Sequence, residues 1–290
     1  MTTLGITGAG GELGRAATDH VLRADPDTDL VLLTRNPDAL AGNRPAGSVR
    51  IRQADFDAPE ELPAAFDGID VLLLISTDAV GRRAEQHRAA IAAAAKAGVG
   101  RVVYTSATNP HVEHPAELAP LMRDHAETEV ALQAAGMSWT ILRNALYLDA
   151  LAPAWAQSAA TGTLVSNNGT GRHAPVARDD CAAAAAAVLT TAGHDKATYN
   201  VAGARLIDDE ASAALLSKAY GRTVEVVPVS DQQYAAGLQE AGLPPAVAGP
   251  IVGFGASIRG GLLEAPLGDT EKLIGRAPIS IEAFLSPAGS

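Results

Sequence analysis

Residues 3–14 read TLGITGAGGELG, and this stretch decides the fold. A short apolar run at residues 4–6 predicts a strand, three glycines follow at a GxxGxxG spacing, and residues 12–22 predict a helix. Glycine permits a tight turn, and the N–H groups at the start of the helix attract the pyrophosphate of a dinucleotide. Glycines alone would indicate only a turn, but their place between a strand and a helix favours nucleotide binding. The predicted binding residues are Gly8, Ala9, Gly10, Gly11, Glu12, Leu13 and Gly14.

From this turn to residue 143, short apolar runs alternate with longer helical stretches. The predicted strands are residues 4–6, 30–33, 49–52, 71–75, 101–104 and 139–142, each rich in Val, Ile or Leu. The predicted helices between them are residues 12–22, 60–66, 83–97 and 124–135. This alternation predicts an α/β fold, a Rossmann-type doubly wound parallel sheet.

The pattern is less regular after Leu146. Pro153, residues 167–169 and Pro175 predict turns, and residues 242–268, rich in glycine and proline, predict a lid over the substrate. Further helices are predicted at residues 179–191, 208–220 and 231–241, and further strands at 198–201 and 224–229. We therefore predict a dinucleotide-binding Rossmann domain at residues 1–150. Residues 151–290 are predicted to form mainly a smaller α/β lobe that caps the substrate, with some segments returning to the first domain.

The composition excludes several classes of protein. Of the 290 residues, 47% are apolar and 19% are charged, which is enough apolar material for a large core. The net charge of -11 and the absence of a lysine or arginine run argue against nucleic-acid binding. No apolar stretch reaches the roughly 20 residues that span a bilayer, so no membrane partner is predicted. The N-terminus leaves no room for a secretion signal, and the single cysteine, Cys181, excludes an intrachain disulfide, so we expect a cytoplasmic protein.

The ends of the second and third strands carry candidate contacts to the rest of the cofactor. The second strand ends at Thr34-Arg35, where a protein specific for NAD usually has an acidic residue for the ribose hydroxyls. Arg35 suits a 2′-phosphate and predicts NADPH in preference to NADH, although an arginine at a strand end is also common on protein surfaces. Asp55 and Phe56 follow the third strand and are predicted beside the adenine. A turn-forming aspartate and a core phenylalanine would give the same sequence.

Four segments spread along the chain resemble one family. They are GITGAGGELG (5–14), VLLLISTDAVGRRAEQHRAAIAAAAKAGVGRVVYTS (71–106), DHAETEVALQAAGMSWTILRNALYLD (124–149) and GASIRGGLLEAPLGDTEKLIGRAP (255–278). With them the chain resembles the NmrA-like group of atypical short-chain dehydrogenases/reductases, and within it the type 2 NAD(P)H:quinone oxidoreductases and triphenylmethane reductases. The resemblance implies an enzyme without flavin or metal that passes hydride from NADPH to a quinone, with the C-terminal lobe closing the pocket.

The resemblance also implies roles for further residues. Ile75, Ser76 and Thr77 would lie beside the nicotinamide ribose. Leu142, Asn144, Ala145 and Leu146 would flank the nicotinamide. Asn144 would hydrogen-bond the carboxamide or a substrate carbonyl, and Tyr147 would stack on a planar acceptor.

The chain also departs from the patterns of its relatives. Typical short-chain dehydrogenases have a lysine four residues after a tyrosine, but residues 105–108, which follow Tyr104, read TSAT. The usual proton relay is therefore absent. His125 stands where many NmrA-like proteins have a lysine, and Gly10 stands where they usually have a threonine.

Reduction of a quinone needs alignment of the acceptor and stabilisation of charge on its oxygen more than it needs an acid. Tyr104, His125 and Asn144 are the predicted hydrogen-bond donors. His125 either donates a proton or a neutral N–H group, or only caps a helix and pairs with Asp124. Tyr104 either acts in the site or packs at the end of its strand.

Two other features predict structure rather than chemistry. His111, Glu113 and His114 share one loop, but the flanking prolines predict an exposed turn and no fourth ligand is evident, so we expect no metal site. Cys181 begins an alanine-rich helix, which predicts a buried packing residue rather than a reactive thiolate.

The sequence therefore predicts an NADPH-dependent reductase of quinones or similar planar, electron-poor acceptors. One alternative is a non-catalytic, NADP(H)-sensing NmrA-like regulator that acts through a protein partner. Another is a reductase of a dye, an imine or a pathway-specific enone. An open cleft beside the nicotinamide would favour an enzyme over a sensor. An exposed apolar helix face at the edge of the sheet would support a homodimer.

Overall fold

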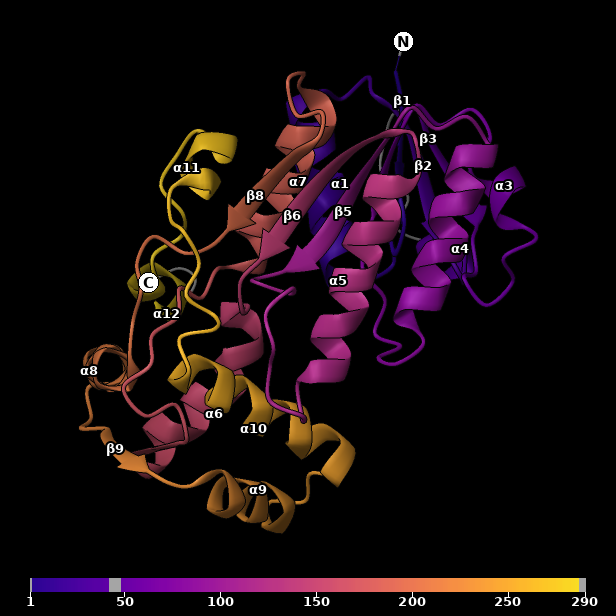
Figure 1. The fold of residues 1–290 in the computed structure, drawn as a ribbon. Helices are drawn as coiled ribbons and strands as arrows, with labels where there is room; N and C mark the ends of the chain where they lie inside the picture. Colours follow the sequence, from indigo (N-terminus) through magenta and orange to yellow (C-terminus); the bar gives the residue numbers. More distant parts are fainter. Residues whose placement is uncertain (1, 42–47, 287–290) are drawn as a thin grey trace.

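The central feature of the fold is a seven-stranded parallel sheet (Figure 1). The computed structural model describes residues 2–41 and 48–286. The strands lie in the order β3-β2-β1-β4-β5-β6-β8, and all neighbours pair in parallel. This is the strand order of a Rossmann fold with one added strand, so the predicted fold class is confirmed. The bounds are β1 (Thr3–Ile6), β2 (Asp29–Thr34), β3 (Val49–Gln53), β4 (Val71–Leu74), β5 (Arg101–Ala107), β6 (Ser138–Asn144) and β8 (Ala197–Val201).

Helices cover both faces of the sheet, which explains why a central strand such as β4 is apolar throughout. One face carries α1 (Glu12–Ala24), α7 (Arg178–Thr190) and α11 (Asp269–Ile274), and the other carries α3 (Leu62–Ala65), α4 (Arg83–Lys96) and α5 (Ala119–Ala134) (Figure 1). The short α2 (Asp38–Ala41) follows β2. In β4, Leu73 packs in the core under α1 and α7, whereas Leu72 and Leu74 pack in the core under α4 and α5. Alternate side chains point to opposite faces, so both sets are buried.

A second group of elements lies beyond the carboxyl ends of the strands, toward which the arrowheads of β5, β6 and β8 point (Figure 1). It contains a two-stranded parallel sheet of β7 (Thr163–Ser166) and β9 (Glu225–Pro228). Its helices are α6 (Leu148–Thr161), α8 (Asp209–Tyr220), α9 (Asp231–Glu240), α10 (Pro245–Arg259) and α12 (Ile281–Leu285). The elements α7, β8 and α11 return to the main sheet, so the chain passes between the two parts more than once. The domain boundary at residue 150 stays a prediction.

Three local predictions are wrong. Pro153 lies inside α6 rather than in a turn, because Leu148 and Trp155 bury the helix in the C-terminal core, and this burial outweighs the missing N–H hydrogen bond. Helix α5 begins at Ala119, with a proline in its first turn, where proline is tolerated. Helix α3 is limited to the four residues Leu62–Ala65.

The glycine- and proline-rich segment at residues 242–268 contains the helix α10, which the sequence pattern concealed. Its glycines permit close packing rather than a loop. A Cβ on Gly253 would lie 2.8 Å from the backbone nitrogen of Leu118, and a Cβ on Gly255 would overlap the side chain of Asn167. Of the helices that the structure describes, none is both long and apolar enough to cross a membrane.

Candidate active site

The glycine turn between β1 and α1 has the geometry of a phosphate cradle. Gly8 has a φ of 60°, in the left-handed region that favours glycine. A Cβ on Gly14 would overlap the carbonyl oxygen of Gly8 and lie 2.8 Å from Ala9 Cα, so only glycine lets the helix start this close to the turn. Gly11 is the N-cap of α1 and supplies no side-chain hydrogen bond, so the first N–H groups of the helix remain available. These groups fit the pyrophosphate of a dinucleotide.

The other predicted cradle residues divide between the core and the surface. Ala9 and Leu13 are buried, Gly10 is half-buried and Glu12 is exposed. The N–H of Ala9 donates to the carbonyl oxygen of Leu33 at 3.2 Å, which places the turn against the end of β2. Arg35 follows that strand, is exposed, and forms no ion pair with another described residue. Its guanidinium is therefore available to an anion beside the cradle.

Asp55 and Phe56 lie after β3 and still fit both interpretations. Asp55 accepts a hydrogen bond from the N–H of Asp57 at 3.0 Å, as a turn-forming aspartate does. Phe56 packs on the core and contacts His87 edge to face, with 6.4 Å between ring centroids. Both residues are half-buried, so their contact with an adenine stays a prediction.

Hydroxyl groups of neighbouring strands fix the segment after β4. The N–H of Ile75 donates to Thr7 Oγ1, and the N–H of Ser76 donates to Thr105 Oγ1, both at 2.9 Å. Ile75 also lies beside the cradle, because its Cβ is 3.6 Å from the position that a Cβ on Gly8 would take. Residues 75–77 thus connect the cradle to the neighbouring pocket, which Ser76 lines.

A pocket of about 280 Å³ lies at the carboxyl ends of β4, β5 and β6. This is the edge at which open α/β sheets bind ligands. Leu142 is fully buried in the core and does not line the pocket, so only the later part of the predicted segment does. The lining residues are Ser76, Arg83, Ser106, Ala107, Thr108, Leu121, Met122, His125, Asn144, Ala145, Leu146, Tyr147, Ala150, His173, Phe254 and Leu263.

The structure joins Asn144 to Tyr147. Asn144 Nδ2 donates to the Tyr147 hydroxyl at 3.0 Å, which orients the amide, while Asn144 Oδ1 is buried and has no hydrogen-bond partner among the described residues. Burial raises the pKa of Tyr147, so the phenol is neutral at pH 7. The Arg178 guanidinium lies over the Tyr147 ring, 5.5 Å from its centroid.

Arg178 is a residue that sequence reasoning missed. It forms ion pairs with Glu12, at the start of α1, and with Asp149, at the start of α6. With its contact to Tyr147, it links the cradle to the pocket. The residue begins α7, and no local pattern indicates that this helix start lies beside that of α1.

Tyr104 and His125 meet in a buried network beside the pocket. Arg83 Nη1 lies 3.1 Å from His125 Nε2. Because a guanidinium can only donate, Nε2 accepts this hydrogen bond and Nδ1 carries the ring proton. Nδ1 then donates to the Tyr104 hydroxyl at 2.8 Å. Burial, and next the charge of Arg83, hold the pKa of His125 well below its usual value, and burial raises the pKa of Tyr104. Both side chains are therefore neutral at pH 7.

Arg83 is the second residue that sequence reasoning missed. It lines the pocket, is only 6% exposed, and forms no ion pair with another described residue. Its Nε donates to the carbonyl oxygen of Thr77. The sequence offers two adjacent arginines, but only the structure shows that Arg82 turns outward to Asp57 while Arg83 turns inward. A buried cation at the pocket wall attracts negative charge on a ligand.

Glu129 fastens the carboxyl ends of β5 and β6 beside the pocket. Its buried carboxylate accepts hydrogen bonds from Ser106 Oγ (2.6 Å) and from Arg143 Nε and Nη2 (3.0 and 2.7 Å), and it lies 2.7 Å from His111 Nε2. Burial alone raises the pKa of Glu129, but the hydrogen bonds from Arg143, Ser106 and His111 outweigh it, and the pKa is lowered. Glu129 is therefore a carboxylate at pH 7.

The loop that contains His111 and His114 is only partly exposed. His114 is buried, with Nδ1 3.1 Å from Ser257 Oγ and Nε2 3.0 Å from the carbonyl oxygen of Asn109. The predicted exposed turn is therefore wrong for His114, because α10 packs over this part of the loop. Cys181 is buried, which confirms the packing interpretation, and burial raises the pKa of its thiol.

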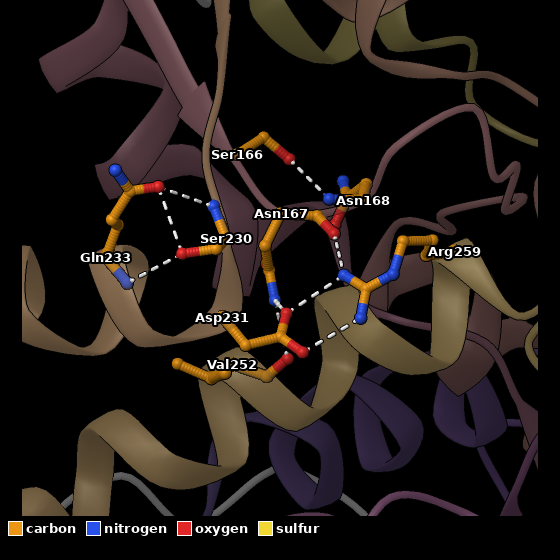
Figure 2. A network of polar contacts seen from close by, with 8 residues as sticks. All are labelled: Ser166, Asn167, Asn168, Ser230, Asp231, Gln233, Val252 and Arg259. Carbon is orange, nitrogen blue, oxygen red and sulfur yellow. Dashed lines mark hydrogen bonds and ion pairs between the residues drawn. The ribbon is translucent and has the colours of Figure 1, made fainter.

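A polar network fixes α10 to the loop that follows β7 (Figure 2). Asp231, at the start of α9, accepts hydrogen bonds from both Nη atoms of Arg259 (2.9 and 2.8 Å) and from Asn167 Nδ2 (2.7 Å). Asn167 Nδ2 also donates to the carbonyl oxygen of Val252 at 2.9 Å, and Arg259 donates to the carbonyl oxygen of Asn167. The network holds in place the helix that supplies Phe254 to the pocket.

Comparison with known proteins identifies a family that includes the glycine cradle. The pattern of a family described as NAD(P)H-binding matches residues 8–192, which include the cradle and the pocket residues from Ser76 to His173. The chain belongs to this NAD(P)H-binding family. Quinone oxidoreductase 2 of Escherichia coli (strain K12) is 36% identical over 290 residues, which cover 98% of this chain and 97% of that protein.

Two solved structures of similar proteins contain the cofactor. The E. coli NADPH-dependent quinone oxidoreductase, complexed with NADPH, matches with a TM-score of 0.91 and 33% identity over 97% of this chain and 98% of that one. The triphenylmethane reductase of Citrobacter sp., complexed with NADP(H), matches with a TM-score of 0.89 and 30% identity over the same shares. These matches confirm the fold and the resemblance that the four sequence segments predict.

Proposed function

We propose that the chain is an NADPH-dependent oxidoreductase that passes hydride to a quinone or a similar planar, electron-poor acceptor, without flavin or metal. The observation that carries the proposal is the pocket at the carboxyl ends of β4, β5 and β6, which connects through residues 75–77 to the glycine cradle. Leu121, Met122, Leu146, Phe254 and Leu263 give it apolar walls suited to a ring. The similarity to the E. coli quinone oxidoreductase supports the same acceptor class.

The chain would hold the dinucleotide along the carboxyl edge of the sheet. The cradle would bind the pyrophosphate, and Arg35 the 2′-phosphate that distinguishes NADPH from NADH. Asn144 Oδ1, to which no described residue donates, would accept a hydrogen bond from the carboxamide. When bound, NADPH supplies the hydride.

Positioning and charge, rather than proton donation, are the main catalytic contributions in this proposal. Both ring nitrogens of His125 are occupied by Arg83 and Tyr104, and the pKa of His125 is lowered mainly by burial. Neither His125 nor Tyr104 is therefore a ready acid at pH 7. The Tyr147 ring would lie against the acceptor, and the Arg83 guanidinium would stabilise negative charge on the acceptor oxygen.

The alternatives differ in what the pocket does. A sensor needs no space for an acceptor, whereas the described residues leave about 280 Å³ beside Ser76 and Asn144, so the enzyme is favoured. A dye reductase would use the same pocket, as the similarity to a triphenylmethane reductase suggests. A cytoplasmic location and a homodimer belong to the proposal as well.

The test is steady-state oxidation of NADPH with simple benzoquinones and naphthoquinones, run in parallel with NADH. We expect turnover that prefers NADPH, and a roughly 10- to 100-fold loss of that preference in Arg35→Ala, because a charge-assisted contact to phosphate is removed. Arg23→Ala, at the other end of α1, is the matched control. Tight NADPH binding without turnover of any quinone would refute the proposed activity.

A further inference from the structure

The acceptor pocket contains buried polar atoms that the chain leaves without partners. Among the described residues, four buried side-chain atoms have neither a hydrogen bond nor an ion pair: Thr108 Oγ1, Asn144 Oδ1, Asn167 Oδ1 and His173 Nδ1. Three of these residues, Thr108, Asn144 and His173, line the pocket. A buried polar atom without a partner destabilises the protein, so three such residues at one site indicate a ligand that supplies the missing hydrogen bonds.

His173 is the least explained of the three. It reaches the pocket from the loop between β7 and α7, and it is 7% exposed. Nδ1 is buried, and neither Nδ1 nor Nε2 makes a hydrogen bond to another described residue. Burial lowers the pKa of His173 to about 4, so the imidazole is neutral at pH 7. A neutral imidazole has one N–H group to donate and one bare nitrogen to accept.

The backbone around His173 is fixed on two sides. Its N–H donates to the carbonyl oxygen of Ile207 at 3.0 Å, and the N–H of Ile207 donates back at 2.8 Å. Before it, a Cβ on Gly171 would overlap the carbonyl oxygen of Ile258, so the loop lies directly against α10. The network of Asn167 and Arg259 in Figure 2 holds the same loop. An unpartnered ring on so rigid a support is arranged to bind a ligand rather than to pack.

We infer that His173 is a specificity-determining residue that hydrogen-bonds an oxygen of the acceptor. The inference rests on the proposed function. It narrows the acceptors to compounds that carry a second carbonyl or hydroxyl oxygen besides the one that faces Arg83, as a quinone does. Since neither ring nitrogen is committed, the ring offers an N–H group to a quinone carbonyl and a bare nitrogen to the hydroxyl of the hydroquinone product. The same residue can therefore hold the substrate and the product.

Three variants separate this role from a structural one. His173→Phe keeps an aromatic ring and removes both nitrogens, whereas His173→Asn and His173→Gln place an amide near the positions of Nδ1 and Nε2. Each is compared with the wild-type protein for kcat and KM with 1,4-benzoquinone and 1,4-naphthoquinone. Calorimetry then measures binding of 1,4-naphthoquinone to the NADP⁺-loaded protein. The NADPH dissociation constant and the thermal midpoint serve as controls.

We expect His173→Phe to lower kcat/KM for quinones roughly 5- to 100-fold, mainly through KM, and to weaken naphthoquinone binding by a similar factor. One of the two amide variants should recover most of this loss, and NADPH affinity should not change. Unchanged KM and naphthoquinone affinity in His173→Phe, or equal losses in all three variants, would overturn the inference. If the wild-type protein binds naphthoquinone through His173 but does not oxidise NADPH with it, the proposed function fails and the inference stands.

Discussion

Replacement of Glu129 by glutamine measures how much the buried carboxylate between β5 and β6 contributes to the free energy of unfolding. The Glu129 side chain is 0% exposed, and its two oxygens each face two donor groups, from Ser106 and Arg143 at Oε1 and from Arg143 and His111 at Oε2. A glutamine keeps one oxygen but turns an NH₂ group toward two of these donors. Each donor left unmatched costs about 1–3 kcal/mol, so we expect Glu129→Gln to lower the free energy of unfolding by about 3 kcal/mol.

The assay is urea unfolding, followed by circular dichroism, at pH 7.5. The matched control is Glu127→Gln on the same helix, because Glu127 is exposed and pairs with the exposed Arg88 at 2.9 Å. Exposed pairs contribute about 0–1 kcal/mol, so the control should remain close to the wild-type protein. Equal, small effects of the two substitutions would refute the account of Glu129 as the fastening group.

Three further outcomes are expected. Gly14→Ala should weaken NADPH binding at least about tenfold in a fluorescence titration, because the added Cβ would overlap the Gly8 carbonyl oxygen. The control Gly237→Ala has open space around it and should bind NADPH like the wild-type protein. Equal NADPH affinities of the two variants would contradict pyrophosphate binding at the glycine turn. Gly255→Ala should lower the free energy of unfolding by about 1–3 kcal/mol through its clash with Asn167, while Gly249→Ala in the same helix should have little effect; if both behave alike, α10 does not pack as described. Burial lowers the pKa of His87, His125 and His173 in the folded protein, to about 3 for His87 and about 4 for His173. Below about pH 6.5, the unfolded chain therefore binds more protons than the folded protein does. Stability should therefore fall as the pH drops from 6.5 to 5, by up to about 1.4 kcal/mol per pH unit for each histidine, and a flat profile in urea unfolding would show that these side chains are not buried and neutral.

The sheet was predictable because its strands are governed by local rules. Apolar runs such as residues 30–33 and 71–75 are recognisable on their own, and the glycine turn fixes the point at which the first strand passes to a helix. Residues 144–147 were placed by resemblance, and the structure brings them to the pocket edge. Leu142 precedes the carboxyl end of β6 by two residues, is fully buried in the core and so does not reach the pocket.

The parts that could not be predicted depend on contacts between distant segments. Helix α10 has glycines and prolines that locally predict a loop, and only its close approach to Asn167 and Leu118 explains them. Arg83 and Arg178 belong to no sequence motif. Their roles depend on tertiary contacts, because Arg83 faces the pocket and Arg178 pairs with Glu12 of a distant helix. His173 lies 29 residues after Asn144 in the sequence, yet both residues line one pocket. No sequence pattern predicts this proximity.

We propose that this chain passes hydride from NADPH directly to a quinone. The most direct measurement is a single-turnover stopped-flow experiment in which protein shown by its absorbance spectrum to be free of flavin, loaded with one equivalent of NADPH, is mixed with 1,4-benzoquinone. It is repeated with NADPH that carries deuterium at the transferred position of the nicotinamide. We expect one hydroquinone for each NADPH consumed, and a slower reaction with the deuterated cofactor. Stable NADPH that is not consumed beyond the rate without protein, or turnover only after addition of flavin, would contradict the account.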